Sequence, residues 1–135
     1  MLKQKIKYLK FLFLFFLLVG IDQAFKIYVV HSNFAYQFNR LYILGLVGIN
    51  NYLYSLLVFI FLFFLSVEFL RSSTIKQVVY IFILSGVISQ YISRVYFGGV
   101  VDFINVFNIT IINIADLYIV IGALFLFTLL LSKKY

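Results

Sequence analysis

Residues 52–70 read YLYSLLVFIFLFFLSVEFL, a run in which Glu68 is the one charged side chain. A helix needs about 20 predominantly apolar residues to cross the hydrocarbon layer of a bilayer, so this run predicts a membrane-spanning helix. Runs of the same character occupy residues 8–30, 78–95 and 111–131, and the chain contains no proline that would interrupt them. We therefore expect an all-α integral membrane protein with four transmembrane helices, in a single domain over residues 1–135.

The composition of the whole chain agrees with this expectation. Hydrophobic residues make up 65% of the sequence and charged residues 11%, whereas an ordinary soluble domain is about 45–50% apolar. This composition disfavours a soluble enzyme, a disordered tail and a nucleic-acid-binding protein. The chain has no cysteine, one histidine and four acidic residues, so we expect no disulfide, no metal site and no cofactor.

The basic residues predict how the helices are oriented. Eight of them would lie on one side of the membrane: Lys3, Lys5, Lys7, Lys10, Arg71, Lys76, Lys133 and Lys134. Lys26, Arg40 and Arg94 would lie on or near the other side, where segments 31–51 and 96–110 form a small loop or β element. The positive-inside rule then places both termini in the cytoplasm. A cleaved secretory signal is the alternative reading of the N-terminus, but no small-residue cleavage site follows its apolar run.

Three of the four acids are aspartates that the topology places towards the outer face: Asp22, Asp102 and Asp116. Ionisable groups at membrane depth are costly, so their default interpretation is functional. Glu68 stands three residues before Arg71, where we expect an ion pair at the end of a helix.

Asp102 and Asp116 are fourteen residues apart, which would separate them by about 21 Å on one continuous helix. Residues 103–113 must turn back before the fourth span, and a hairpin-like excursion there could bring the two carboxylates together. Two adjacent carboxylates share a proton and can act as a general acid–base pair. The alternative is that Asp102 is an ordinary loop residue and Asp116 an acid favoured by the dipole at a helix N-terminus.

Two short-range pairs accompany these aspartates. Asp22 and Lys26 stand at i and i+4 on one helix face, where they could neutralise each other as a silent ion pair or support a site. Asn113 precedes Asp116 by three residues, so its amide could orient that carboxylate. Gly98 and Gly99 predict a tight turn after the third span.

Three motifs of this chain resemble those of the lipoprotein signal peptidases (signal peptidase II). The first span carries an Asp-Gln pair followed by Lys, here Asp22-Gln23-Ala-Phe-Lys26. An arginine ends the third span and precedes a Val-Val-Asp-Phe block, here Arg94 and then residues 100–103. The fourth span opens with an Asn-x-Ala-Asp block, here residues 113–116, with Gly122 following. The order, the spacing and the four-span topology agree along essentially the whole chain.

The resemblance implies an aspartic endopeptidase that removes signal peptides from prolipoproteins by cleaving before the cysteine that carries a diacylglyceryl group. It assigns catalysis to Asp102 and Asp116, without metal or cofactor, and implies a multi-pass protein of the bacterial inner membrane with an extracytoplasmic active site. The expected partners are the lipidated substrate and membrane lipids, and we expect a monomer. Residues that would bind substrate or support the pair are Asp22, Lys26, Asn39, Gln90, Arg94, Asn113 and Ala115. Tyr36, Tyr42 and Tyr52 would lie at the interface, as a platform for the peptide or as plain anchors.

The chain also departs from the family pattern. The outer-loop motif Asn-x-Gly-Ala-x-Phe is reduced to Asn39 without the Gly-Ala part. Gln90 stands where the family has Asn, and it can make the same kind of hydrogen bond. Ser93 replaces the acid beside Arg94. The sequence thus resembles a divergent member, and two alternatives stay open: a catalytically impaired relative that binds lipoproteins, and a proton-relay subunit of a small transporter.

Overall fold

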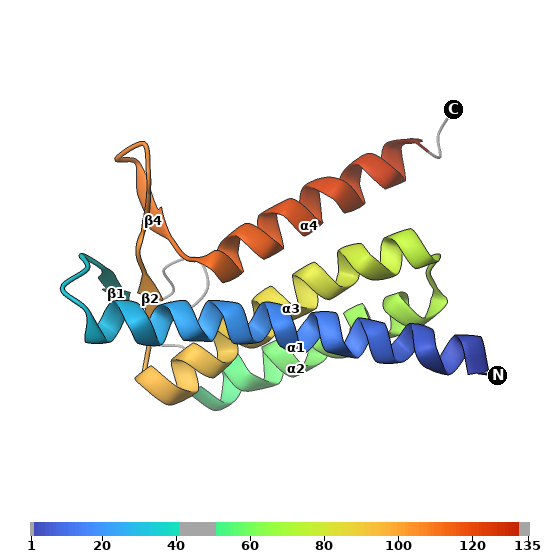
Figure 1. The fold of residues 1–135 in the computed structure, drawn as a ribbon, viewed down its shortest axis with the longest axis horizontal. Coiled ribbons are helices and arrows are strands. Elements are labelled where there is room, and N and C mark those ends of the chain that lie inside the picture. Colours follow the sequence, from blue (N-terminus) through green and yellow to red (C-terminus); the bar gives the residue numbers. More distant parts are fainter. Residues whose placement is uncertain (1, 41–50, 133–135) are drawn as a thin grey trace.

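The computed structural model describes residues 2–40 and 51–132. Four helices form the bundle: α1 (Leu2–His31), α2 (Asn51–Arg71), α3 (Thr74–Phe97) and α4 (Ile114–Leu131). Four short strands lie at one end of it: β1 (Gln37–Asn39), β2 (Val100–Asp102), β3 (Ile104–Val106) and β4 (Thr110–Ile112). The start of α1 and the end of α4 lie at the opposite end of the bundle from the strands (Figure 1).

All four helices are long and apolar enough to cross a membrane, which confirms the four predicted spans. The boundaries of α2 agree with the prediction within one residue, whereas the other three helices begin elsewhere than predicted, and α3 begins at Thr74, four residues earlier. Helix α1 begins at Leu2 because the lysine-rich segment continues the helix, and lysine is a good helix former. Helix α4 begins at Ile114, three residues later than predicted, because residues 110–112 form strand β4 instead.

Polar and apolar side chains are distributed in the reverse of the pattern in soluble proteins. Large apolar side chains such as those of Phe13 and Phe63 are exposed on the outside of the bundle. Fully buried side chains in its interior include the charged Asp22 and Lys26 and the polar Asn113. A surface of this kind is suited to contact with lipid chains, and the structure describes a multi-pass membrane protein.

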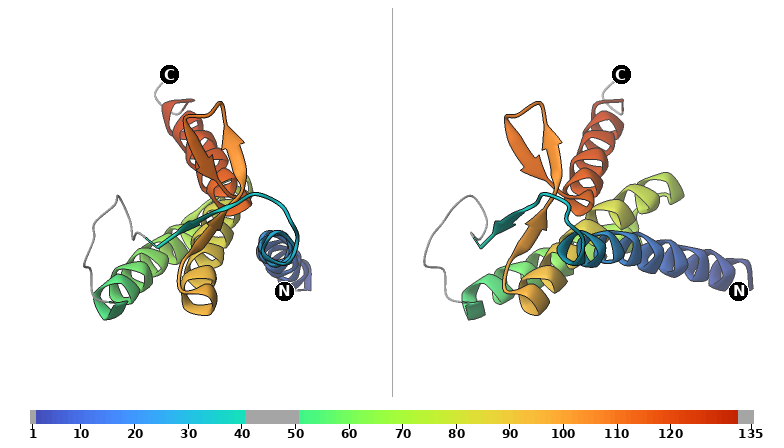
Figure 2. Two further views of the ribbon diagram at one scale, coloured as in Figure 1. Left: turned by 90° about the vertical axis from the view of Figure 1, so that its left-hand side faces the viewer. Right: turned by 60° about the vertical axis from the view of Figure 1, so that its left-hand side comes forward.

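Helix α3 is the central element, and it packs against α1, α2 and α4 (Figure 2). Two glycines permit its close contact with α4. A Cβ atom on Gly86 would lie 2.7 Å from the backbone oxygen of Ala115, and one on Gly122 would lie 2.6 Å from the side chain of Ile83. Small residues at such crossings let helix backbones approach each other in a membrane.

The strands form two antiparallel pairs. Strand β1 pairs with β2, with Gln37 opposite Asp102 and Asn39 opposite Val100. Strand β3 pairs with β4, with Ile104 opposite Ile112. The predicted fold-back of residues 103–113 is therefore confirmed as a β hairpin, whereas the pairing of β1 with β2 within the expected β element was not predicted.

The turn between α3 and β2 uses glycine as expected. Gly98 ends the helix in the left-handed conformation, with φ of 74°, and its N–H donates to the carbonyl of Arg94 at 3.1 Å. Such a C-terminal glycine is a common way to stop a helix. Gly99 lies against β1, where a Cβ atom would come within 2.9 Å of the backbone oxygen of Asn39.

Candidate active site

One asparagine side chain connects the two aspartates that the sequence singled out. The amide nitrogen of Asn113 donates to the carboxylate of Asp102 at 2.6 Å. The side-chain oxygen of Asn113 accepts from the backbone N–H of Asp116 at 3.1 Å, and the Asp116 carboxylate accepts from the backbone N–H of Asn113 at 3.1 Å. This reciprocal pair is a capping box at the start of α4. The hairpin thus brings Asp102 and Asp116 into one hydrogen-bond network.

Gln90 joins the same network from helix α3. Its side-chain nitrogen lies 2.6 Å from a carboxylate oxygen of Asp116 and 3.3 Å from the side-chain oxygen of Asn113. A carboxylate that accepts from Gln90 and from the Asn113 backbone has its orientation fixed by two separate elements. The expected hydrogen bonding by Gln90 is therefore present.

Asp102 lies on β2, with 6% of its surface exposed. Burial raises the pKa of its carboxyl above the ordinary value of 3.8, and the nearby charge of Asp116 raises it further. Hydrogen bonds from Asn113 and Asn39 and the charge of Lys26 act in the opposite direction without reversing the shift in pKa. Asn39 reaches Asp102 because β1 pairs with β2. The environment of Asp102 thus favours the protonated acid.

A second polar cluster lies deeper in the bundle, between α1 and α3. Lys26 contacts Asp22 at 2.6 Å, and both side chains are fully buried, so the predicted pairing is present. Lys26 also donates to the hydroxyl of Ser93 at 2.9 Å, and Asp22 accepts from the hydroxyl of Ser89 at 2.5 Å. The serine that replaces an acid beside Arg94 is therefore a direct partner of the buried lysine.

The Gln23 side chain extends this cluster. Its nitrogen lies 2.7 Å from the hydroxyl of Ser89 and 3.1 Å from that of Ser93. It also lies 2.9 Å from the backbone oxygen of Ser89. Gln23 thus links α1 to α3 through Ser89 and Ser93.

The deep cluster is connected to the outer network through the backbone. The N–H of Ala115 donates to the Asp22 carboxylate at 2.9 Å, and Ala115 is fully buried. Ala115 lies between Asn113 and Asp116 in the first turn of α4, where N–H groups lack partners within the helix. The Asp22 carboxylate therefore fixes the turn that carries Asp116.

An apolar hollow of about 370 Å³ opens beside Asp116. Its polar lining side chains are Gln90, Arg94, Asp116 and Tyr54. The guanidinium of Arg94 lies 5.6 Å from the centre of the Tyr54 ring, a cation–π contact. The rest of the lining is apolar and comes from α2, α3 and α4: Leu57, Val58, Phe61, Val87 and Ile119. Asp116 thus faces a space that suits an apolar chain.

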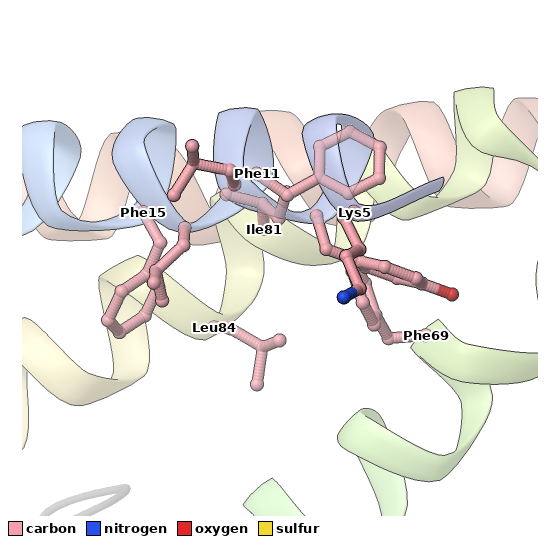
Figure 3. Close-up of a pocket in the computed structure, with 9 residues that line it drawn as sticks. Lys5, Phe11, Phe15, Phe69, Ile81 and Leu84 are labelled. Atoms are coloured by element: carbon pink, nitrogen blue, oxygen red, sulfur yellow. The ribbon is translucent and has the colours of Figure 1, made fainter. Parts of the chain in front are cut away.

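Another hollow, of about 540 Å³, lies near the beginning of α1 (Figure 3). Its lining includes Lys5, Phe11 and Phe69 but no acidic side chain. Its volume is the larger of the two, yet it lies away from the aspartates and its lining contains no carboxylate that could activate water. We therefore place the candidate active site at the strand end of the bundle.

The residues predicted for the site fall into three groups. The outer network contains Asp102, Asp116, Asn113, Gln90 and Asn39. The deep cluster contains Asp22, Lys26 and Ala115. Arg94 lines the hollow. Tyr36 is exposed, Tyr42 lies outside the described residues, and nothing is described of the Tyr52 side chain. We expected an ion pair between Glu68 and Arg71. Within residues 51–132, which the structure describes, these two side chains do not form one.

The sequence interpretation missed the role of the serines. Ser85, Ser89 and Ser93 are fully buried, and they stand at i, i+4 and i+8, which places them on one face of α3. That spacing could have identified them as one face of the helix. In the described part of the chain, no three His, Asp or Glu side chains gather in a way that could hold a metal ion.

A family model described as signal peptidase (SPase) II matches residues 14–132. A comparison with curated proteins finds no match.

Two solved structures, each described as a bacterial membrane enzyme studied by the in meso method, have similar folds. The one at 2.3 Å resolution has a TM-score of 0.81 and 22% identity, over 93% of this chain and 89% of that chain. The one at 1.9 Å resolution has a TM-score of 0.78 and 23% identity, over 90% of this chain and 92% of that chain. The likeness to these two structures establishes the shared fold.

Proposed function

Since this chain belongs to the signal peptidase II family of membrane proteases that process lipoprotein signal peptides, we propose that it is an aspartic endopeptidase. Its substrate is a prolipoprotein whose signal peptide lies in the membrane, and the bond that it cleaves precedes the cysteine carrying a diacylglyceryl group. The observation that carries the proposal is the network in which Asn113 holds Asp102 while it caps the helix turn of Asp116.

The two carboxyl groups have different environments, which suggests different roles. Asp102 is buried and its raised pKa favours the protonated form, so it is the proton donor at the start of the reaction. Asp116 accepts hydrogen bonds from Gln90 and from the Asn113 backbone, which hold its carboxylate in one orientation beside the hollow. It is the base that accepts a proton from the attacking water.

The reaction needs no further cofactor to balance. The water oxygen bonds to the carbonyl carbon of the scissile peptide while one of its protons passes to Asp116 and the Asp102 proton passes to the carbonyl oxygen. When the carbon–nitrogen bond breaks, the leaving nitrogen accepts the proton held by Asp116. Asp102 recovers a proton from the diol as the new carboxyl group forms.

The hollow beside Asp116 is suited to the apolar part of the substrate. Leu57, Phe61 and Val87 line it, and Asp116 and Arg94 lie in the same lining. A signal peptide or a lipid chain in this space would stay in an apolar environment while its scissile bond meets the carboxylates. Arg94 would contact the polar backbone or the glyceryl ester groups of the substrate.

The deep cluster would support the site and not contact the substrate. Asp22 is the partner of Lys26 and of the Ala115 N–H. Both charged side chains are fully buried, so they have no access to the hollow. Their role in the proposal is to hold the first turn of α4, and with it Asp116, in place.

The charge distribution supports an extracytoplasmic site. Lys5 and Lys10 belong to the start of α1 and Arg71 to the end of α2, and both of these segments lie at the end of the bundle away from the strands (Figure 1). The positive-inside rule assigns that end to the cytoplasm. The carboxylates would then lie at the outer face of the membrane. The proposal includes a monomer in the bacterial inner membrane.

Complementation tests this proposal directly. In a bacterium depleted of its own enzyme, the wild-type chain is expected to restore processing of a lipidated prolipoprotein, and Asp102→Asn and Asp116→Asn are each expected to abolish it. Immunoblotting of membranes checks that both variants accumulate. Processing at the wild-type rate by either variant refutes the acid–base assignment. If the wild-type chain binds the lipidated substrate but never cleaves it, the protein is an impaired binding relative.

A further inference from the structure

The β3–β4 hairpin is joined to both halves of the candidate active site. It begins two residues after Asp102 and ends one residue before Asn113. The N–H of Phe103 donates to the carbonyl of Ile112 at 2.9 Å, which closes the base of the hairpin. A force on the hairpin is therefore transmitted to the strand of Asp102 and to the helix of Asp116 together.

The turn of this hairpin contains a residue that does not suit its backbone conformation. The N–H of Ile109 donates to the carbonyl of Val106 at 2.9 Å, and the two residues between them, Phe107 and Asn108, have φ of 51° and 58°. Asparagine adopts positive φ readily, but a bulky residue such as phenylalanine does so rarely and with strain. The stability of the turn by itself does not account for Phe107.

Asparagine side chains reinforce the turn around the strained residue. The side chain of Asn105 accepts from the backbone N–H of Asn108 and donates to the side chain of Asn108, both at 2.8 Å. The strained conformation is thus held by specific bonds.

Phe107 and Ile109 form the hairpin tip, and they are the most exposed large apolar side chains among the residues that the structure describes. Their exposed fractions are 88% and 84%. Nothing in the described chain covers them. An exposed apolar tip on a polar turn favours contact with an apolar environment outside the chain.

The direction of the hairpin indicates what that environment is. The hairpin leaves the end of the bundle sideways, on the side towards which α4 leans, and does not continue along the long axis of the bundle (Figures 1 and 2). Because α4 is a membrane-spanning helix, a hairpin in this position extends over the lipid surface beside it. Aromatic residues are enriched at that level of membrane proteins.

We propose that Phe107 and Ile109 insert into the lipid headgroup region and anchor the hairpin, and that this anchor sets the depth of Asp102 and Asp116 relative to the bilayer. The first part depends only on the membrane fold. The second part rests on the proposed function.

The absence of cysteine from the chain permits a clean labelling experiment. Thr110→Cys, next to the tip, carries a bimane fluorophore, and the protein is reconstituted in phosphatidylcholine vesicles. Lipid carrying a nitroxide near its headgroup is expected to quench the label strongly, and aqueous iodide weakly. In the Phe107→Asn background, quenching by the nitroxide lipid is expected to fall at least twofold and quenching by iodide to rise. The matched control Phe107→Leu keeps an apolar tip and should keep the wild-type ratio.

Thermal unfolding separates anchoring from folding. Because asparagine suits the left-handed conformation, Phe107→Asn is expected to unfold at the same temperature as wild type or higher. Strong iodide quenching of the wild-type label, or protection from both quenchers as a second protein copy would give, overturns the anchor. If Phe107→Asn loses lipid contact yet processes substrate at the wild-type rate, the depth role is wrong. If the wild-type chain processes nothing, the proposed function fails while the quenching data still decide the anchor.

Discussion

The Asn113 side chain donates a 2.6 Å hydrogen bond to Asp102 from within a fully buried position at the start of α4. Asn113 is at once the N-cap of α4 and the link between the two aspartates. The two roles can be separated by substitution because they use different atoms of the amide.

Asn113→Ser should retain the cap and lose the link, since the serine hydroxyl can accept from the Asp116 N–H but is too short to reach Asp102. Asn113→Ala should lose both. We expect Asn113→Ala to destabilise the protein by about 1–3 kcal/mol, and Asn113→Ser by less than half of that. Both should lower the rate of processing by about 100-fold through misplacement of Asp102. Unfolding in detergent and turnover of a lipidated peptide measure the two effects. A serine variant with wild-type turnover would show that the link is unimportant.

Asp102 should make the stability of the protein depend on pH. Its pKa is raised in the folded state, mainly by burial, so the folded chain holds this proton to a higher pH than the unfolded chain does. Stability is then lost as the pH rises from 3.8, the ordinary value, through the higher folded-state pKa. Asp102→Asn removes this loss, because its amide is neutral. It should therefore unfold at a higher temperature than wild type at pH 7, and the difference should shrink towards pH 4. A variant that is less stable than wild type at pH 7 would contradict this account.

The buried pair of Asp22 with Lys26 should show strong coupling in a double-mutant cycle. Asp22→Asn leaves the Lys26 ammonium buried without a counter-charge. Lys26→Met likewise leaves the Asp22 carboxylate buried without a counter-charge. Each single change is expected to cost about 3–5 kcal/mol of unfolding free energy. The double variant should cost less than the sum, with a coupling of about 1–3 kcal/mol. Denaturant unfolding in micelles measures all four proteins, and additive effects would mean that the two charges do not depend on each other.

Gly86→Ala should disturb the site through the backbone. The added Cβ would lie 2.7 Å from the backbone oxygen of Ala115, so α4 must move away from α3 and carry Asp116 with it. We expect a loss of about 1–3 kcal/mol in stability and a fall of about tenfold or more in turnover. Gly20→Ala is the matched control, since nothing lies within 4 Å of its added Cβ. That variant should keep full activity and gain up to about 1 kcal/mol from helix propensity. Equal effects of the two changes would refute the packing argument.

The helices could be predicted from the sequence because span length and apolar composition are local properties. The fold-back of residues 103–113 was also predictable, since a chain that leaves the membrane must return for the fourth span. The pairing of β1 with β2 was not, because it joins Gln37 to Asp102 across two whole helices. No local pattern in a three-residue strand specifies such a distant partner.

The same reasoning applies to the candidate site. Asp22 and Lys26 could be paired from their spacing, because one helix turn separates them. Their contacts with Ser89 and Ser93 depend on how α1 rotates against α3, which the sequence of either helix alone does not fix. The hydrogen bond from Ala115 to Asp22 is donated by the backbone N–H. Almost every residue type has this donor, so the sequence does not reveal the contact.

That backbone contact joins the first span to the last, because Asp22 belongs to α1 and Ala115 to α4. Spans enter the bilayer in the order of synthesis, so a nascent chain with three spans inserted has no partner for this carboxylate and has not yet placed residue 116. Under the proposed function, proteolytic competence therefore arises only after the last span has inserted, and a ribosome-bound precursor is inert towards neighbouring lipoproteins until its final helix leaves the translocon.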